Sequence, residues 1–230
     1  MLVSIHQPNY LPWPGFFHKW MLADAFIILD TVQFRKNDWQ NRNRIKTANG
    51  PQWLTVPVHY HFPAIINEVD ISQDPWLHKQ LAAMEQSYAK APYFQDYWDN
   101  IQSVLTQPWQ KLSDMNTALI RLLGEVVGCH APLYLASEMQ VENTDPTGRL
   151  IDLCRELGGS AYLAGIDGKK YMQGSQFSEA DIDLWYQDVQ APVYHQLHGE
   201  FVSYLSVVDL LFNVGPEASK VIREMGGKVR

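Results

Sequence analysis

A stiff, polar segment near the amino terminus could bind and act on a ligand. Residues His6–Gly15 hold three prolines and end in a glycine, and proline fixes the backbone dihedral φ, so the segment has a restricted shape. An imidazole can give or take a proton near neutral pH, which makes His6 a candidate acid or base. Gln7, Asn9 and Tyr10 are the accompanying candidates for ligand binding. The alternative is a rigid connection in which His6 is hydrogen-bonded inside the core.

A run of basic residues follows at a short distance. Five of the chain's 18 lysines and arginines fall between Arg35 and Lys46, opposed in that span only by Asp38. Guanidinium groups bind phosphate or carboxylate through paired hydrogen bonds, and a tryptophan can stack on a sugar or a base. The run therefore predicts a phosphate- or carboxylate-bearing small molecule as partner, and the alternative is a solvated basic loop. The residues expected to contact this partner are Arg35, Lys36, Trp39, Arg42 and Arg44.

Two weaker patterns lie in the second half of the chain. Gly165 and Gly168 follow an expected strand and precede Tyr171, so their amides could meet an anion, although an ordinary tight turn explains them equally well. Asp209 and Asn213 are four residues apart in an expected helix and share one of its faces, where they could line a site or buttress a neighbouring loop.

Metal ions and nucleic acids are not expected as partners. The eight histidines are scattered, and His59 and His61 form the only close pair, which is too few ligands for a metal site. A formal net charge of −7 argues against a surface that binds nucleic acid.

The candidate groups need elements to position them, and the first thirty residues predict a β-α-β unit. Leu2–His6 is expected to form a strand, Gly15–Ala23 a helix and Phe26–Asp30 a second strand. Ligands of such units bind at the carboxyl ends of the strands, where both His6 and Asp30 fall. Asp30 is therefore the second catalytic candidate.

Alternating strand and helix patterns continue along the chain and predict an α/β fold with a mostly parallel sheet. Residues 53–60 and 67–72 are expected to pair as an antiparallel excursion. Helices are expected over 75–107 with a boundary at Pro92, and over 112–126, 147–157 and 203–212; strands are expected over 160–164 and 182–186. We expect one domain over 1–230, with residues 75–130 as a candidate helical subdomain.

The location of the protein is also predicted from hydropathy. The longest apolar runs are much shorter than the roughly 20 residues that span a bilayer, and the amino terminus lacks the basic start and apolar core of a signal peptide. A cytoplasmic protein without a membrane span is expected.

Several separated segments resemble, in order, the WbqC-like family of bacterial surface-polysaccharide gene clusters. They are residues 6–13, 30–34, 39–44, 162–168 and 205–215. The resemblance implies a role in making O-antigen or a related glycan. Our first hypothesis is a transferase or ligase that moves an acyl, aminoacyl or nucleotidyl group to or from an activated sugar. The second is a non-catalytic binding or scaffolding protein of an assembly complex, suggested by the aromatic residues Trp76, Tyr93, Trp98 and Trp109.

The opening β-α-β unit also resembles, more distantly, that of nucleotidyl transferases and pantothenate synthetase, which bind ATP. Such a core would carry the residues 75–130 as a helical insertion. Trp13 and Phe16 stand near the places where those enzymes have paired histidines, which argues against ATP chemistry. ATP is the one cofactor that this resemblance implies.

Overall fold

A six-stranded sheet forms the centre of the protein in a computed structural model that describes residues 1–170 and 172–230. Its strand order is β7-β2-β1-β8-β9-β10, and all neighbouring pairs are parallel except β9 and β10. The strands are β1 (Leu2–His6), β2 (Ala25–Ile28), β7 (Leu133–Leu135), β8 (Ala161–Ala164), β9 (Asp183–Val189) and β10 (Gly226–Val229). The predicted α/β fold with a mostly parallel sheet is confirmed.

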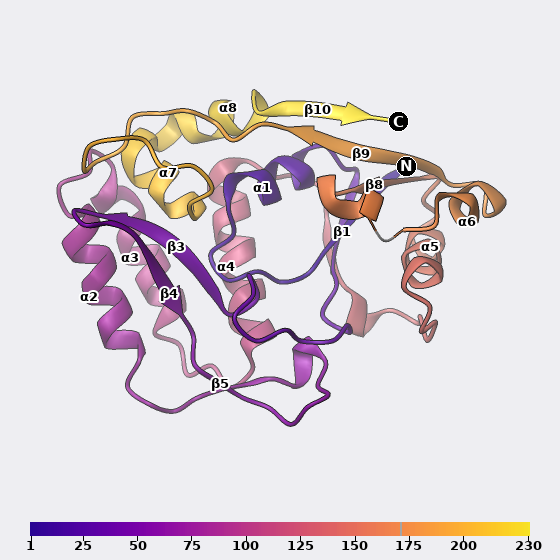
Figure 1. Cartoon of the computed structure of the whole chain (residues 1–230), viewed down its shortest axis with the longest axis horizontal. Coiled ribbons are helices and arrows are strands. Elements are labelled where there is room, and N and C mark those ends of the chain that lie inside the picture. Colours follow the sequence, from indigo (N-terminus) through magenta and orange to yellow (C-terminus); the bar gives the residue numbers. More distant parts are fainter. Residues whose placement is uncertain (171) are drawn as a thin grey trace.

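Helices cover both faces of this sheet, as the side chains of β2 show. Phe26 and Ile28 belong to one hydrophobic cluster, whereas Ala25 and Ile27 belong to a second, because successive strand residues point to opposite faces. Figure 1 shows α5 (Pro146–Glu156) and α6 (Gly174–Glu179) at the right, with β1 between them and the helices at the left. Those at the left include α2 (Leu77–Tyr88), α3 (Phe94–Leu105), α4 (Leu112–Val127) and α7 (Val207–Val214).

The predicted β-α-β opening is present. Helix α1 (Pro14–Met21) connects β1 to β2, which pair in parallel with Ile5 opposite Ile27. Helix α1 starts with Pro14. The first N–H groups of a helix have no partner within it, so a residue without an N–H costs no hydrogen bond at this position. The carboxyl ends of β1 and β2 therefore lie at the same edge of the sheet.

Two short hairpins lie outside the sheet. Strand β3 (Arg42–Thr47) pairs antiparallel with β4 (Gly50–Thr55), and β5 (Val58–His59) with β6 (Asp70–Ile71). The second pair is the predicted antiparallel excursion. The prediction of one strand over 53–60 was wrong, because the chain leaves the first hairpin at Val56, whose N–H donates to the Asn41 carbonyl, and Pro57 has no N–H to continue a ladder.

The remaining predicted elements are present with shifted ends. The helix expected from Ser203 begins at Val207, because Tyr204 has a positive φ of 58° and the Ser206 hydroxyl caps the helix by accepting from the Val208 N–H. Elements β3, β7, β10, α6 and α8 (Ala218–Arg223) were not predicted. Among the described residues, no helix is both long and apolar enough to cross a membrane.

Residues of α2, α3 and α4 share one hydrophobic cluster with residues of α1, α7 and α8. The single domain over 1–230 and its helical subdomain stay predictions.

Replacing Gly124 by alanine should destabilise the protein, although alanine is the better helix former. A Cβ at Gly124 in α4 would lie 2.3 Å from a ring carbon of Trp20, so the helix and the ring would have to separate. We expect the free energy of unfolding to fall by about 1–3 kcal/mol in urea denaturation. Gly174→Ala is the control, since its Cβ would meet only Leu184 at 3.8 Å. Equal stability of the Gly124 variant and the wild type would contradict this account of the contact.

Candidate functional site

His6 ends β1 and is held as a neutral imidazole. Its Nδ1 lies 3.0 Å from the Gln7 carbonyl oxygen, which can only accept, so the hydrogen is assigned to Nδ1 and Nε2 keeps its lone pair. The ring meets Phe16 edge to face at 4.7 Å. Burial, and secondarily the charge of Lys19, lower the pKa of His6 to about 3. His6 can therefore accept a proton or a hydrogen bond at Nε2, but it is not charged near neutral pH.

Lys19 stands beside this strand end and was not predicted. It is 3% exposed, its Nζ donates to the Ile5 carbonyl at 2.7 Å, and burial lowers its pKa to about 7. No carboxylate of the described residues lies within ion-pair distance of it. The available signal in the sequence was that Lys19 is the only lysine or arginine in helix α1, whose other residues, apart from His18, are apolar.

The order of the strands places Lys19 at the point where the chain changes direction across the sheet. From β1 the chain moves to β2 and β7 on one side and later returns to β8 on the other side. Ligands of open α/β sheets bind outside the carboxyl ends of the strands at such a point. Here those ends carry His6 and, directly after β8, Gly165.

The two candidate glycines after β8 differ in their surroundings. The Gly168 N–H donates to the Gly165 carbonyl at 2.9 Å, and a Cβ at Gly168 would collide with Met172 and Ala164, so this glycine serves a tight turn. A Cβ at Gly165 would meet only Lys19 Nζ, at 4.0 Å. Tyr171 lies outside the described residues.

The basic run divides into an exposed loop and a strand. Arg35 and Lys36 are exposed on the loop. Strand alternation puts Arg42 and Arg44 on one face of β3, so for these two the alternative of a solvated loop is wrong. Arginine, asparagine and lysine are not typical strand residues, so the sequence of this segment did not predict a strand.

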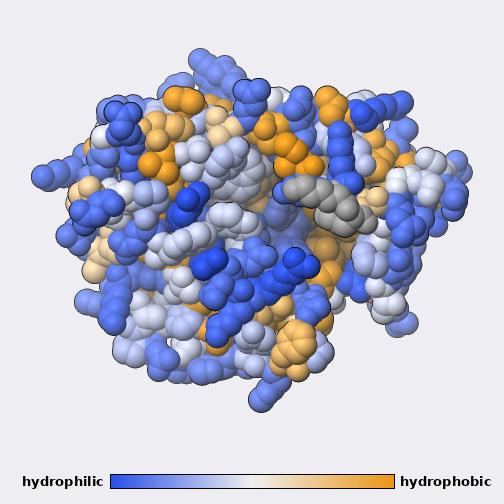
Figure 2. Space-filling model, in the orientation of Figure 1, coloured by the Kyte–Doolittle hydropathy of each residue, from blue (hydrophilic) through white to orange (hydrophobic). Residues whose placement is uncertain are grey.

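Trp53 on β4 lies against both arginines. The Cζ atoms of Arg42 and Arg44 lie 4.2 and 5.6 Å from the centre of its ring, and Trp39 lies 5.7 Å from it, centre to centre. Trp39 and Trp53 are each 42% exposed, so a ring of a ligand can reach them. Figure 2 shows strongly hydrophilic residues gathered near the middle of the face that carries β3.

The two arginines have unfilled hydrogen-bonding capacity. The Nε atoms of Arg42 and Arg44 are buried and have no hydrogen-bond partner, and neither side chain forms an ion pair within the described part of the chain. One terminal nitrogen of Arg44 donates to the Tyr204 carbonyl at 3.4 Å. Buried donors are normally satisfied, so these atoms are suited to an anionic ligand.

Amide side chains connect this arginine cluster to the segment after β1. Gln40 donates to the Gln7 side chain at 2.7 Å. Asn43 donates to the Leu11 carbonyl at 2.7 Å, and Asn116 of α4 donates to the carbonyls of Pro8 and Gln40. The two halves of the predicted site are thus joined directly, by the predicted residue Gln7 and by Gln40, Asn43 and Asn116, which were not predicted as part of it.

Other predicted site residues have structural contacts. The Asp30 carboxylate is 4% exposed and accepts from the N–H and the hydroxyl of Ser137 at 3.0 and 2.6 Å. The hydroxyl of Tyr10 is buried and donates to Gln80 at 2.7 Å. Asn9 is 7% exposed. The side chains of Asp30 and Tyr10 thus have hydrogen-bond partners within the protein, Ser137 and Gln80.

Asp209 and Asn213 lie in the core, where they support a loop. Asp209 accepts from the hydroxyls of Tyr88 and Tyr194 at 2.7 and 2.8 Å, and the Asn213 oxygen accepts from the Leu197 N–H. Burial raises the pKa of Asp209. These contacts match the buttressing alternative.

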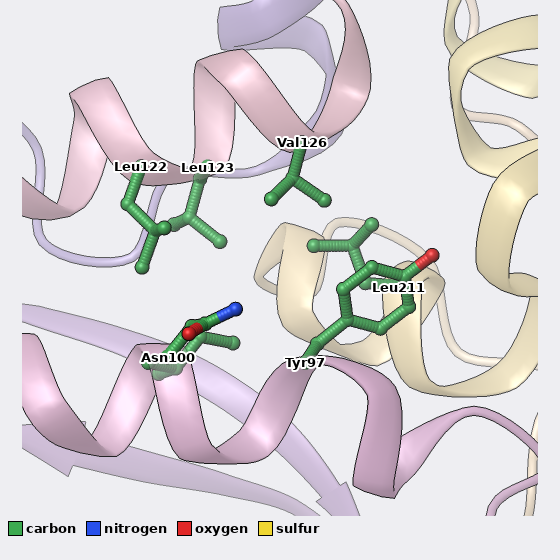
Figure 3. A pocket seen from close by; sticks show the side chains of 7 residues that line it. Tyr97, Asn100, Leu122, Leu123, Val126 and Leu211 are labelled. Atoms are coloured by element: carbon green, nitrogen blue, oxygen red, sulfur yellow. The ribbon is translucent and has the colours of Figure 1, made fainter.

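The described residues include no group of histidine, cysteine and acidic side chains that could hold a metal ion. A small cavity of about 10 Å³ lies between α3, α4 and α7 (Figure 3), with room for about one water. It is lined by Tyr97, Asn100, Ile101, Leu122, Leu123, Val126 and Leu211. Neither His6 nor Arg42 belongs to its lining.

Comparison with known proteins places the whole chain in one family. The chain matches the WbqC-like protein family over residues 7–221. It is 36% identical over 226 residues to the uncharacterized protein Rv1507c of Mycobacterium tuberculosis, and the alignment covers 96% of this chain and 97% of that protein. The chain therefore belongs to the WbqC-like protein family.

Proposed function

We propose that this protein is a transferase or ligase that acts on an activated sugar in the synthesis of a bacterial surface polysaccharide. In this proposal Arg42 and Arg44 bind the anionic group of the substrate, and Trp53 contacts a ring of it. His6, with a free lone pair at Nε2, is the candidate proton acceptor.

One observation carries the proposal: two neighbouring arginines with buried, unpartnered Nε atoms. The chain has 25 acidic residues and a net charge of −7, so acidic partners for arginine are abundant in its composition. Burying a cation without a counter-charge costs free energy. A bound phosphate or carboxylate would supply both the charge and the acceptors.

The aromatic rings support a substrate that carries a ring as well as a charge. Trp39 and Trp53 are large apolar surfaces left open beside the guanidinium groups, and such surfaces stack on sugars and bases. A nucleoside diphosphate sugar joins these two chemistries in one molecule.

Isothermal titration calorimetry with nucleoside diphosphate sugars and ATP tests the proposal. A hydrogen bond to a charged group contributes about 1.5–3 kcal/mol, so Arg42→Ala and Arg44→Ala should each weaken binding by roughly tenfold or more. Arg121→Ala, an exposed arginine of α4, is the matched control and should bind like the wild type. Unchanged affinity in both test variants, or no binding of any of these ligands by the wild type, would refute the proposal.

The scaffolding hypothesis was suggested by four aromatic residues, and none of them is exposed: Trp76, Tyr93, Trp98 and Trp109. Trp98 is 5% exposed and stacks on Phe94, and Trp76 and Trp109 are partly buried against the same hydrophobic cluster. These rings pack the helices and do not form an exposed apolar patch.

A further inference from the structure

We infer a second anion-binding subsite, for a phosphate or carboxylate group, between the carboxyl ends of β1 and β8, formed by Lys19 and the backbone at Gly165. This inference extends the proposed function and rests on it in one respect: the bound anion is taken to be a second anionic group of the same substrate.

The first observation is a buried cation without a counter-charge. Lys19 is 3% exposed, and the one hydrogen bond of its ammonium goes to the neutral Ile5 carbonyl. An ammonium has three donors, so two remain for a ligand. A lysine kept inside the protein at this cost in stability is typical of a functional group.

The second observation is open space in front of that ammonium. Apart from the two chain neighbours of Gly165, the described atom nearest to a Cβ added there is Lys19 Nζ, at 4.0 Å, whereas at Gly168 Met172 and Ala164 lie within 2.9 Å. Among the described residues, the space at Gly165 is therefore open toward the lysine. A compact anion would be in contact with the ammonium there.

The third observation is location. The subsite lies at the change of direction between β1 and β8, where open parallel sheets bind their ligands. It also lies next to the segment that Gln7 and Gln40 join to the arginine cluster. In this inference, one substrate with two anionic groups occupies both subsites.

Among the described residues, few other charged groups face Lys19. From β1, His6 is neutral, since its pKa is lowered to about 3. After β8, Asp167 is exposed, and Lys169 lies over the Tyr186 ring at 4.7 Å. On the same helix, His18 contacts Gln187 of β9. Burial is the cause that lowers the pKa of Lys19 to about 7, so an anion bound against it should raise that pKa again.

Proton uptake provides a direct test with the full chain and inorganic pyrophosphate as the probe. With a Lys19 pKa of about 7, a substantial part of these side chains is neutral at pH 7, so binding should take up roughly half a proton per site more in the wild type than in Lys19→Arg, where only pyrophosphate itself titrates. Calorimetric titrations in two buffers of different ionisation enthalpy measure this number. Lys19→Met should lose the uptake and bind at least tenfold more weakly, whereas Lys19→Arg should keep the binding and lose the uptake, because arginine is always charged.

Two glycine variants provide a second test that leaves the charge in place. Gly165→Ala should weaken pyrophosphate binding by at least tenfold with an unchanged melting temperature, because its methyl group fits the protein but fills the subsite. Gly227→Ala is the matched control, since a Cβ there also meets nothing, and it should bind like the wild type.

The outcomes separate this inference from the proposed function. If Lys19→Met loses the binding of pyrophosphate and the proton uptake, while Arg42→Ala and Arg44→Ala leave the affinity for nucleoside diphosphate sugars unchanged, the subsite stands and the arginine proposal fails. If Lys19→Met keeps the affinity and the uptake of the wild type, or if the wild type does not bind pyrophosphate, the subsite is refuted.

Discussion

Asp209→Ala should lower the free energy of unfolding by about 3–5 kcal/mol, as expected when one partner of a buried polar network is removed. The Asp209 side chain is fully buried and accepts from Tyr88 and Tyr194. Alanine would leave both hydroxyls without their acceptor inside the protein, and each unsatisfied group costs about 1–3 kcal/mol. Equilibrium unfolding in urea, followed by tryptophan fluorescence, measures the loss.

Asp209→Asn is the matched control for this prediction. The amide keeps one oxygen acceptor and nearly the same volume, so it should be clearly more stable than the alanine variant. A loss below about 0.5 kcal/mol for Asp209→Ala, the range of ordinary surface substitutions, would show that the network does not stabilise the fold.

The second large effect concerns pH, and Lys19→Met should reveal it. The pKa of Lys19 is about 7 in the folded protein and has an ordinary value of 10.5. Between these two values the unfolded chain binds more protons than the folded one, so the stability of the wild type rises with pH. Over the whole range between these two pKa values, the free energy of unfolding of the wild type should rise by an amount on the order of 4–5 kcal/mol. The methionine variant should not show this rise.

Urea denaturation of both proteins at several values between pH 6 and pH 9 tests this directly. Near pH 6 the Lys19 ammonium is mostly charged in both the folded and the unfolded state, so the difference in stability between wild type and variant should change little with pH there. Above pH 7 that difference should change by about 1 kcal/mol per pH unit in favour of the wild type. Parallel pH profiles of the two proteins would show that Lys19 keeps its ordinary pKa on folding.

Much of the fold could be predicted because its strongest patterns are local. The buried strands Leu2–His6 and Ala25–Ile28 flank a helix that proline starts, and α4 and α5 repeat apolar residues at helical spacing. Strand β3 was missed because its residues Arg42–Thr47 are mostly polar and resemble a charged loop. Its conformation depends on pairing with β4 and on packing against α2 and α7.

The candidate site was only partly predictable, for a related reason. Charge alone marked Arg42 and Arg44, but their lack of partners depends on what folding brings near them. Asp30 lies two residues after β2, where a catalytic acid could lie, yet it is bonded to Ser137, which is 107 residues away in the chain. The sequence around Lys19 does not show that its side chain is buried, because this burial depends on how α1 packs on the sheet.

The connections around the site also bear on when it can form. Strand β1 is made first, but one of its two neighbours, β8, begins at Ala161, and the residue that bonds both Pro8 and Gln40 is Asn116. During synthesis, His6, Arg42 and Arg44 are therefore made long before the residues that fix their arrangement. Contacts between such distant residues form slowly, so a chain interrupted before β8 would carry most of the candidate ligands without a binding site.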